Sequence, residues 1–102
     1  MTKIEEILFE RFSLTEDLYQ EYLNKFIKDG VLKDFPSKET PRVCIFIYCS
    51  RMFEFDKEYS ELAVNFKLKP FYKDDFVLIR RSMVDYGLLS RTPDGTKYVR
   101  NK

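Results

Sequence analysis

The sequence predicts a mostly helical α+β fold, and three observations carry this prediction. Apolar residues recur at helical spacing in several segments, each preceded by a residue that caps helices. Near the C-terminus, Asp94-Gly95 separates two short segments in the way that is typical of a tight β-hairpin. The chain has 102 residues, including 10 Phe and 7 Tyr, so one hydrophobic core is expected.

The N-terminal part is predicted to form two helices. Thr2 and Glu5 are spaced as a capping box, which predicts a helix to about Phe12. The segment 13–16 repeats this spacing and predicts the start of a second helix, which Gly30 is expected to end as its C-cap. One face of that second helix is an apolar stripe made of Leu18, Tyr19, Tyr22, Leu23, Phe26 and Ile27.

A domain boundary is predicted in the connection 31–38. Pro36 restricts Phe35 to an extended conformation, so no helix runs through this segment. We therefore expect an N-terminal helical extension over residues 1–35 and a second unit over residues 36–102.

The segment 42–53 has a composition typical of a strand but the boundaries of a helix. Thr40 is a good N-cap, Pro41 suits the first helical position, and twelve residues without a turn signal exceed a typical strand. The prediction is a buried helix. Cys44 and Cys49 would point about 140° apart on it and are expected to be reduced and buried.

The remaining elements complete an ordered series from residue 41. We predict a short strand at 53–59, a helix at 61–68 capped by Ser60, a helix at 75–86 capped by Asp74 and closed by Gly87, and a hairpin with strands 88–92 and 96–100. Helix, strand, helix, turn, helix and hairpin is the order of a winged helix-turn-helix with a small β-hairpin wing.

Specific segments also carry a family resemblance. They are residues 28–38 with Pro36-Ser37-Lys38, residues 79–89 with Arg80-Arg81 and Val84-Asp85-Tyr86-Gly87-Leu88-Leu89, residues 91–98, and the single residues Arg42 and Tyr59. Over roughly residues 26–100 the chain resembles a bacterial family of domains of unknown function, found alone or attached to repressor-type helix-turn-helix regulators. The resemblance implies a winged-helix fold and a regulatory role, without catalytic residues. Glu39-Thr40-Pro41 stands where the family has more basic residues, which removes charge that DNA could have used.

Composition excludes several function classes. The chain has no His, no Trp and only two Cys, which removes His-based acid-base chemistry, Ser-His-Asp and Cys-His nucleophiles and His-containing zinc sites. It also has no Gly-rich phosphate loop and no carboxylate cluster at ligand spacing, so we expect no enzyme, metal or cofactor. The N-terminus does not resemble a signal peptide, and the longest apolar run, 43–49, is too short to cross a bilayer. A cytoplasmic protein that does not bind membranes is the expectation.

Charge is distributed unevenly and favours double-stranded DNA as the partner. Residues 1–40 carry 6 basic and 9 acidic side chains, a net −3, whereas residues 41–102 carry 12 basic and 8 acidic, a net +4. In the winged-helix interpretation Arg81 reads a guanine edge, Arg80 contacts phosphate, and the turn and the hairpin supply further phosphate contacts. The predicted DNA-contact residues are Lys69, Lys73, Arg80, Arg81, Arg91, Lys97 and Arg100.

Alternatives stay open at each of these positions. The outward face of helix 75–86 also shows Val77, Leu78 and Val84, which suit a protein partner better than DNA, so a protein-interaction or dimerisation module is the second interpretation. Arg81 has an alternative ion pair with Asp85, and the basic hairpin residues also fit an ordinary solvated strand face. Leu18, Tyr19, Tyr22 and Phe26 either pack on the second unit or meet another subunit in a homodimer. The sequence identifies no small-molecule effector.

Overall fold

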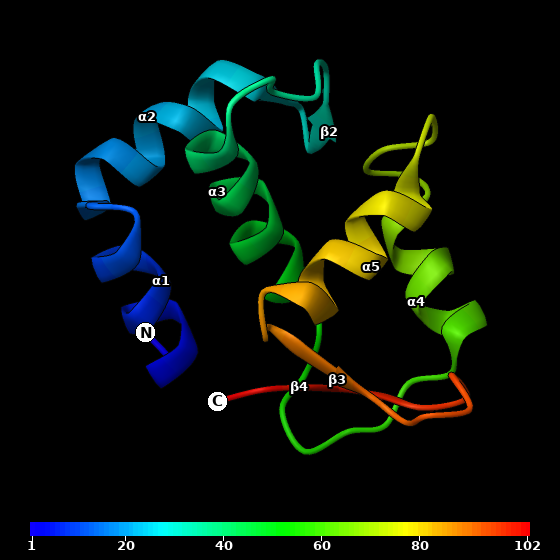
Figure 1. Cartoon of the computed structure of the whole chain (residues 1–102). Coiled ribbons are helices and arrows are strands. Elements are labelled where there is room, and N and C mark those ends of the chain that lie inside the picture. The colour runs from blue at the N-terminus through cyan, green and yellow to red at the C-terminus, as the bar shows by residue number, and fades with distance from the viewer.

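A computed structural model describes all 102 residues and contains five helices and two small antiparallel hairpins (Figure 1). The helices are α1 (Lys3–Arg11), α2 (Glu16–Phe26), α3 (Glu39–Ser50), α4 (Glu61–Leu68) and α5 (Phe76–Asp85), and the strands are β1 (Ile27–Lys28), β2 (Val31–Leu32), β3 (Leu89–Arg91) and β4 (Tyr98–Arg100). The mostly helical α+β prediction is confirmed. None of the five helices combines the length and the apolar composition that a membrane-spanning helix needs.

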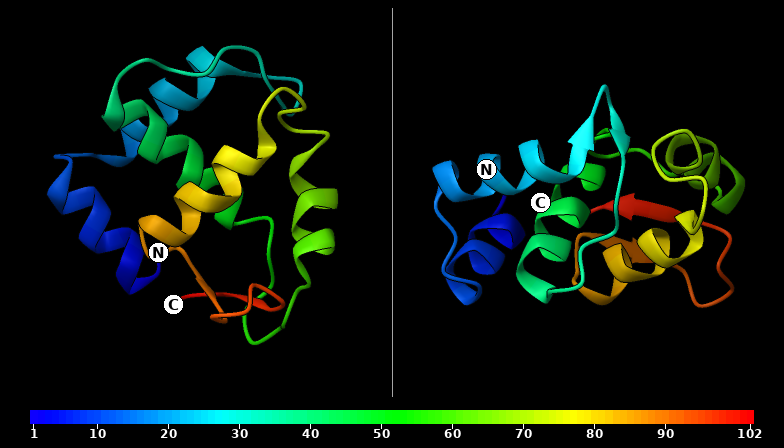
Figure 2. Two further views of the ribbon diagram at one scale, coloured as in Figure 1. Left: turned by 45° about the vertical axis from the view of Figure 1, so that its right-hand side comes forward. Right: turned by 90° about the horizontal axis from the view of Figure 1, so that it is seen from above.

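The helices follow one another across the molecule in an order different from that of the chain. α2 packs on α3, α3 on α5, and α5 on α4, which lies at the outer edge (Figures 1 and 2). The β3–β4 hairpin leaves the end of α5 and returns toward α1, so that both termini of the chain lie close together. The result is a flat body of 35 × 29 × 20 Å.

One hydrophobic core of 22 buried residues joins all five helices and both hairpins. Val43, Ile45 and Ile47 of α3 lie at its centre without any exposed surface. Leu8 of α1 and Tyr19 of α2 belong to the same cluster, so residues 1–35 share their core with the rest of the chain. Both cysteines are free and buried, as predicted.

The two N-terminal helices form as expected, but their boundaries differ. Thr2 and Glu5 make the predicted capping box. The cap of α2 is Thr15 rather than Ser13, which adopts a positive φ of 54° in the turn between the helices. The assignment of Gly30 as a C-cap is wrong, because α2 ends at Phe26 and the chain turns back through β1 and β2. Asp29 and Gly30 have φ of 54° and 74°, and such a pair is what a two-residue hairpin turn requires.

The central helix α3 confirms the helical prediction for the strand-like segment. It begins earlier than predicted, since Lys38 is its N-cap and gives no side-chain hydrogen bond. Thr40 and Pro41 lie inside the first turn, where a backbone N–H has no helical partner and a proline is tolerated. The β-branched and aromatic residues form a helix here because tertiary burial on nearly all sides outweighs their weak helix propensity.

The predicted strand at 53–59 is wrong, because this segment is a loop with one β-bridge. Tyr59 and Tyr98 exchange two backbone hydrogen bonds of 2.8 Å. Phe53 and Tyr59 are both buried, with ring centroids 5.0 Å apart at an interplanar angle of 89°. The chain reverses at Asp56, which has a φ of 58°, and a strand cannot continue through a residue in this left-handed conformation.

The C-terminal elements agree closely with prediction. Ser60 caps α4 by accepting a hydrogen bond from the Ala63 N–H. The cap of α5 is Asp75, one residue later than predicted, because its carboxylate and not that of Asp74 reaches the Leu78 N–H. The predicted hairpin is present with shorter strands, β3 and β4.

Candidate nucleic-acid interface

An open groove of about 400 Å³ lies between α5 and the β3–β4 hairpin. It is lined by Arg81, Val84, Asp85, Arg91, Thr92, Pro93 and Tyr98. Arg81 comes from the helix and Arg91 from strand β3, both are exposed, and neither makes an ion pair within the chain. The alternative pair between Arg81 and Asp85 is therefore not formed, and two uncommitted guanidinium groups face the same groove.

The turn between α4 and α5 carries two further exposed cations. Lys69 is the C-cap of α4, and Lys73 lies near the start of α5. Neither ammonium group is paired with a carboxylate. Both side chains are therefore available to an external anion.

Arg80 is placed differently from its neighbour Arg81. Its side chain is only 11% exposed, Nη1 donates to Asn65 Oδ1 at 2.5 Å, and Nη2 lies 3.5 Å from Glu61 Oε1. Both partners belong to α4. Arg80 thus holds the two helices of the pair together and has little surface to offer a ligand.

The three basic residues of the hairpin also differ in their exposure and in their contacts. Lys97 is exposed and lies 3.8 Å from Glu58. Arg100 is only 12% exposed; its Nη1 donates to the Phe53 carbonyl at 3.2 Å, and its guanidinium lies 4.0 Å from the centre of the Phe55 ring. Arg91 therefore lies in the groove beside α5, whereas Arg100 packs against Glu5, Phe53 and Phe55.

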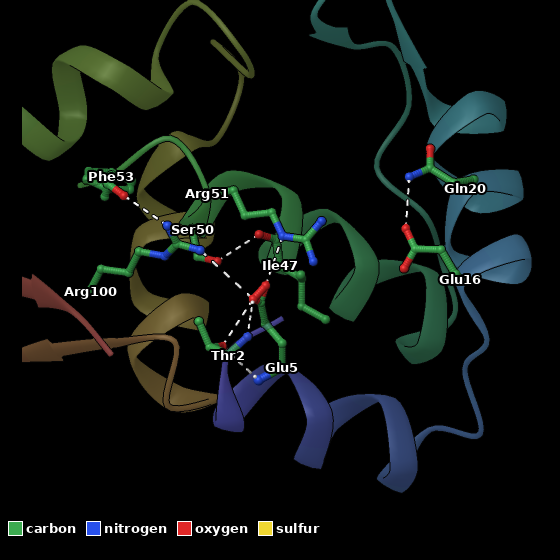
Figure 3. A network of polar contacts seen from close by, with 9 residues as sticks. All are labelled: Thr2, Glu5, Glu16, Gln20, Ile47, Ser50, Arg51, Phe53 and Arg100. Carbon is green, nitrogen blue, oxygen red and sulfur yellow. Dashed lines mark hydrogen bonds and ion pairs between the residues drawn. The ribbon is translucent and has the colours of Figure 1, made fainter. Parts of the chain in front are cut away.

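Arg100 belongs to an ion network that the sequence did not predict (Figure 3). The carboxylate of Glu5 is 2% exposed; Arg51 Nε donates to Oε1 at 2.9 Å, and Arg100 Nη2 lies 3.9 Å from Oε2. Thr2 donates to Oε2 from its hydroxyl at 3.1 Å. Only the capping box was visible in the sequence, since Glu5 and Arg51 are 46 residues apart.

The network changes the acidity of its members. Burial raises the pKa of Glu5, but the hydrogen bond and the charge of Arg51, together with Thr2, outweigh burial and hold that pKa below its usual value. Burial lowers the pKa of Arg100, and the positive charge of Arg51 lowers it further against the opposite effect of Glu5. One carboxylate thus holds two guanidinium groups and joins α1, the end of α3 and β4.

The hairpin tip is held by a single carboxylate. Asp94 accepts hydrogen bonds from the hydroxyl groups of Thr92 and Thr96 and from the Thr96 N–H, at 2.6 to 3.1 Å. These bonds lower the pKa of Asp94 to about 2. The short tip is therefore ordered locally, next to the strand that carries Arg91.

The apolar stripe of α2 divides between the interior and the surface. Tyr19 is 1% exposed, 5.4 Å from the ring of Phe9 and 5.2 Å from the Arg51 guanidinium. Leu18 and Tyr22 are half-buried and line a shallow groove, and Phe26 is half-buried against the core. Tyr19 therefore has the role of a core residue, whereas the other three side chains keep part of their surface exposed.

Comparison with known proteins identifies the family. Residues 31–100, more than half of the chain, match the family described as "Uncharacterized protein conserved in bacteria (DUF2087)". The chain belongs to this bacterial family. No curated protein and no solved structure matches it.

Proposed function

We propose that this chain is a DNA-binding transcriptional regulator that acts through a winged helix-turn-helix. The observation that carries the proposal is the groove between α5 and the hairpin, where Arg81 and Arg91 are exposed and unpaired on opposite walls. Guanidinium groups in this state suit both base edges and phosphates, because they donate several hydrogen bonds in a fixed plane.

The order of elements supports a winged-helix interpretation. α3 is the first helix, α4 and α5 form the helix-turn-helix, and β3–β4 is the wing, with the Tyr59 bridge in the place of the remaining strand. α1 and α2 are the N-terminal extension. In this assignment α5 enters the major groove, and the short Pro93–Gly95 tip lies along the backbone instead of inserting deeply.

Each cation has a distinct role in the proposed complex. Arg81 reads a guanine edge from α5, and Arg91 with Lys97 contacts phosphates along the wing. Lys69 and Lys73 contact the backbone from the turn. Arg80 and Arg100, which are committed to internal contacts, support the reading helix and the wing and add little direct contact with DNA.

A homodimer and a cytoplasmic location fit this proposal. Regulators often bind as two-fold dimers, whose reading helices enter successive major grooves. Leu18, Tyr22 and Phe26 remain candidates for such contact between copies through α2.

A second candidate function, protein interaction without DNA binding, is favoured by one observation. Val77 and Leu78 on the outer side of α5 are each 38% exposed, next to the positions that would read bases. A partner protein would cover these aliphatic side chains, whereas base edges offer them little beyond thymine methyl groups.

The two functions are separated by fluorescence anisotropy with a labelled mixed-sequence duplex at ~50 mM salt, where non-specific attraction is strong. Under the proposal Arg91→Ala weakens binding to all sequences, and Arg81→Ala costs ~1–3 kcal/mol on a selected site and relaxes preference at one base pair. Arg11→Ala on α1 is the matched control and should bind as the wild type does. Equal DNA binding by the wild type and all three variants, or no DNA binding by any of them, favours the second candidate function, protein interaction without DNA binding.

A further inference from the structure

Asp85 is the acidic residue in the lining of the groove between α5 and the β3–β4 hairpin. Its side chain is exposed, and its carboxylate forms no ion pair and accepts no hydrogen bond within the chain. Arg81 lies four residues earlier, at the spacing of a helical ion pair, but the two groups remain apart. Asp85 therefore adds an uncommitted acceptor to a groove that already has two uncommitted guanidinium groups.

The helix itself does not favour a carboxylate at this position. Asp85 is the last residue of α5, and the C-terminal end of a helix carries a partial negative charge. Basic residues are preferred there, yet the last turn of α5 contains none. A residue that opposes local preference without compensation inside the chain is expected at a functional site. Folding therefore gives no reason for this carboxylate, whereas a ligand of the groove does.

The α5 wall of the groove presents a fixed order of chemical groups. Arg81, Val84 and Asp85 all line the groove, and their spacing of three and four residues places them on one side of the helix. They lie in the half of α5 that leads into β3 (Figure 1). Arg81 can only donate hydrogen bonds, the Asp85 carboxylate can only accept them, and Val84 is apolar. The wall thus offers donors at one point and an acceptor one helical turn further along.

An acceptor on a DNA-binding surface has few compatible positions. Phosphate groups repel a carboxylate, so it fits only where a base presents an amino group. In the major groove these amino groups are N4 of cytosine and N6 of adenine. Adenine also presents the acceptor N7 beside N6, which repels a carboxylate oxygen, whereas cytosine presents the N4 donor alone. A carboxylate on the reading helix therefore selects cytosine.

We infer that Asp85 is a specificity-determining residue, which accepts a hydrogen bond from a cytosine amino group near the guanine that Arg81 reads. The inference rests on the proposed function, DNA binding through α5, and adds the base that the acidic residue selects. Residues four apart on a helix have Cβ atoms about 5–6 Å apart, and successive base pairs are about 3.4 Å apart. The guanine and the cytosine are therefore expected one or two base pairs from each other.

The same carboxylate should lower affinity for all other sequences. On a duplex without cytosine at this position, Asp85 finds no amino group and still faces the phosphates. Specificity is a difference between two affinities, so a group that weakens the wrong complexes increases discrimination. Removing the charge should therefore strengthen binding to mixed-sequence DNA and weaken the preference for the selected site.

Selection of duplexes from a random library by the full chain, followed by fluorescence anisotropy, tests the inference. The wild type should enrich a guanine and a cytosine one or two base pairs apart, and replacing that cytosine by thymine or adenine should weaken binding about tenfold. Asp85→Asn should prefer adenine at this position, because an asparagine amide pairs with N6 and N7 of adenine. Asp85→Glu keeps the acceptor and should still prefer cytosine.

Asp74→Asn is the matched control, since Asp74 is exposed just before α5 and does not line the groove. Both asparagine variants change the net charge equally, but only Asp85→Asn should lower the ratio of selected-site to mixed-sequence affinity, by about tenfold. Circular dichroism of each variant confirms that it is folded.

The outcomes separate this inference from the proposed function. Duplex binding without a preference for cytosine, or an Asp85→Asn variant that still selects cytosine, overturns the role of Asp85 and leaves DNA binding in place. A wild type that binds no duplex at ~50 mM salt overturns both.

Discussion

Arg91 and Arg100 stand at the two ends of one hairpin and have different surroundings. Arg100 lies against Glu5, Phe55 and the Phe53 carbonyl and is almost covered. Arg91 has no carboxylate partner and faces an open groove with Arg81. A cation that is already surrounded by protein groups contributes to folding, whereas an uncommitted one is available for a ligand. The position of an arginine in a basic segment therefore does not show whether it stabilises the fold or is available for a ligand. Its contacts in the folded chain do.

Removing the shared carboxylate should have the largest effect. Glu5→Ala leaves Arg51 and Arg100 without their partner, and since Arg51 is 35% exposed we expect a loss of about 2–4 kcal/mol, less than for a fully buried pair. Urea unfolding monitored by circular dichroism measures the change. Glu6→Ala, at an exposed position in the same helical turn, should cost below about 1 kcal/mol. Equal losses for both variants would show that the network does not stabilise the fold.

Acid should weaken the same network. The pKa of Glu5 is lowered from 4.5 in the folded protein, so the unfolded chain binds more protons in this range. The stabilising contribution of Glu5 is therefore present above pH 4.5 and is lost as the pH falls through the folded pKa. Unfolding free energies of the wild type and of Glu5→Gln should differ at pH 6, and the difference should shrink as the pH falls below 4.5. A constant difference across this range would contradict the assignment.

The two ends of the hairpin should respond differently to alanine. Arg100→Ala removes a charge-assisted hydrogen bond and its packing on Phe55, with an expected loss of about 1–3 kcal/mol in stability. Arg91→Ala should change stability by less than about 0.5 kcal/mol, because its guanidinium has no ion-pair partner. Thermal unfolding compares them, and a reversed order would refute the distinction between the two arginines.

The smallest effect is expected at the hairpin tip. Asp94→Ala removes the acceptor shared by Thr92 and Thr96, but the site is exposed, so the thermal midpoint should fall only slightly. Nuclear magnetic resonance should show changes confined to residues 91–98. Changes that spread to the core would indicate a larger structural role for the tip.

Local signals predicted the helices well. The capping box at Thr2, the cap at Ser60 and the hairpin around Asp94-Gly95 each depend on residues a few positions apart, and all are present. The helix α3 was predictable despite its strand-like composition. The length of this segment and the position of Pro41 are also features that depend only on neighbouring residues. Gly30 shows the limit of such signals, since a glycine with positive φ fits both a helix C-cap and a hairpin turn.

Tertiary pairing was not predictable from the sequence. Arg80 and Arg81 are adjacent, yet only Arg80 turns toward Glu61 and Asn65 of α4. The Glu5 network depends on three chain segments that meet only after folding. The exposure of Phe66 could have been inferred from helical spacing, because Leu62 and Phe66 share a face opposite the buried positions of α4.

The salt dependence of DNA affinity measures how many phosphates the exposed cations contact. Each phosphate contact by Arg or Lys contributes about −0.9 to the slope of log affinity against log salt concentration. If Lys69, Lys73, Arg91 and Lys97 bind phosphates as proposed, a wild-type monomer on mixed-sequence duplex should give a slope of about −3 to −4, reduced by roughly one in Arg91→Ala. A slope near zero, or no measurable binding at ~50 mM salt, would contradict the DNA-binding proposal.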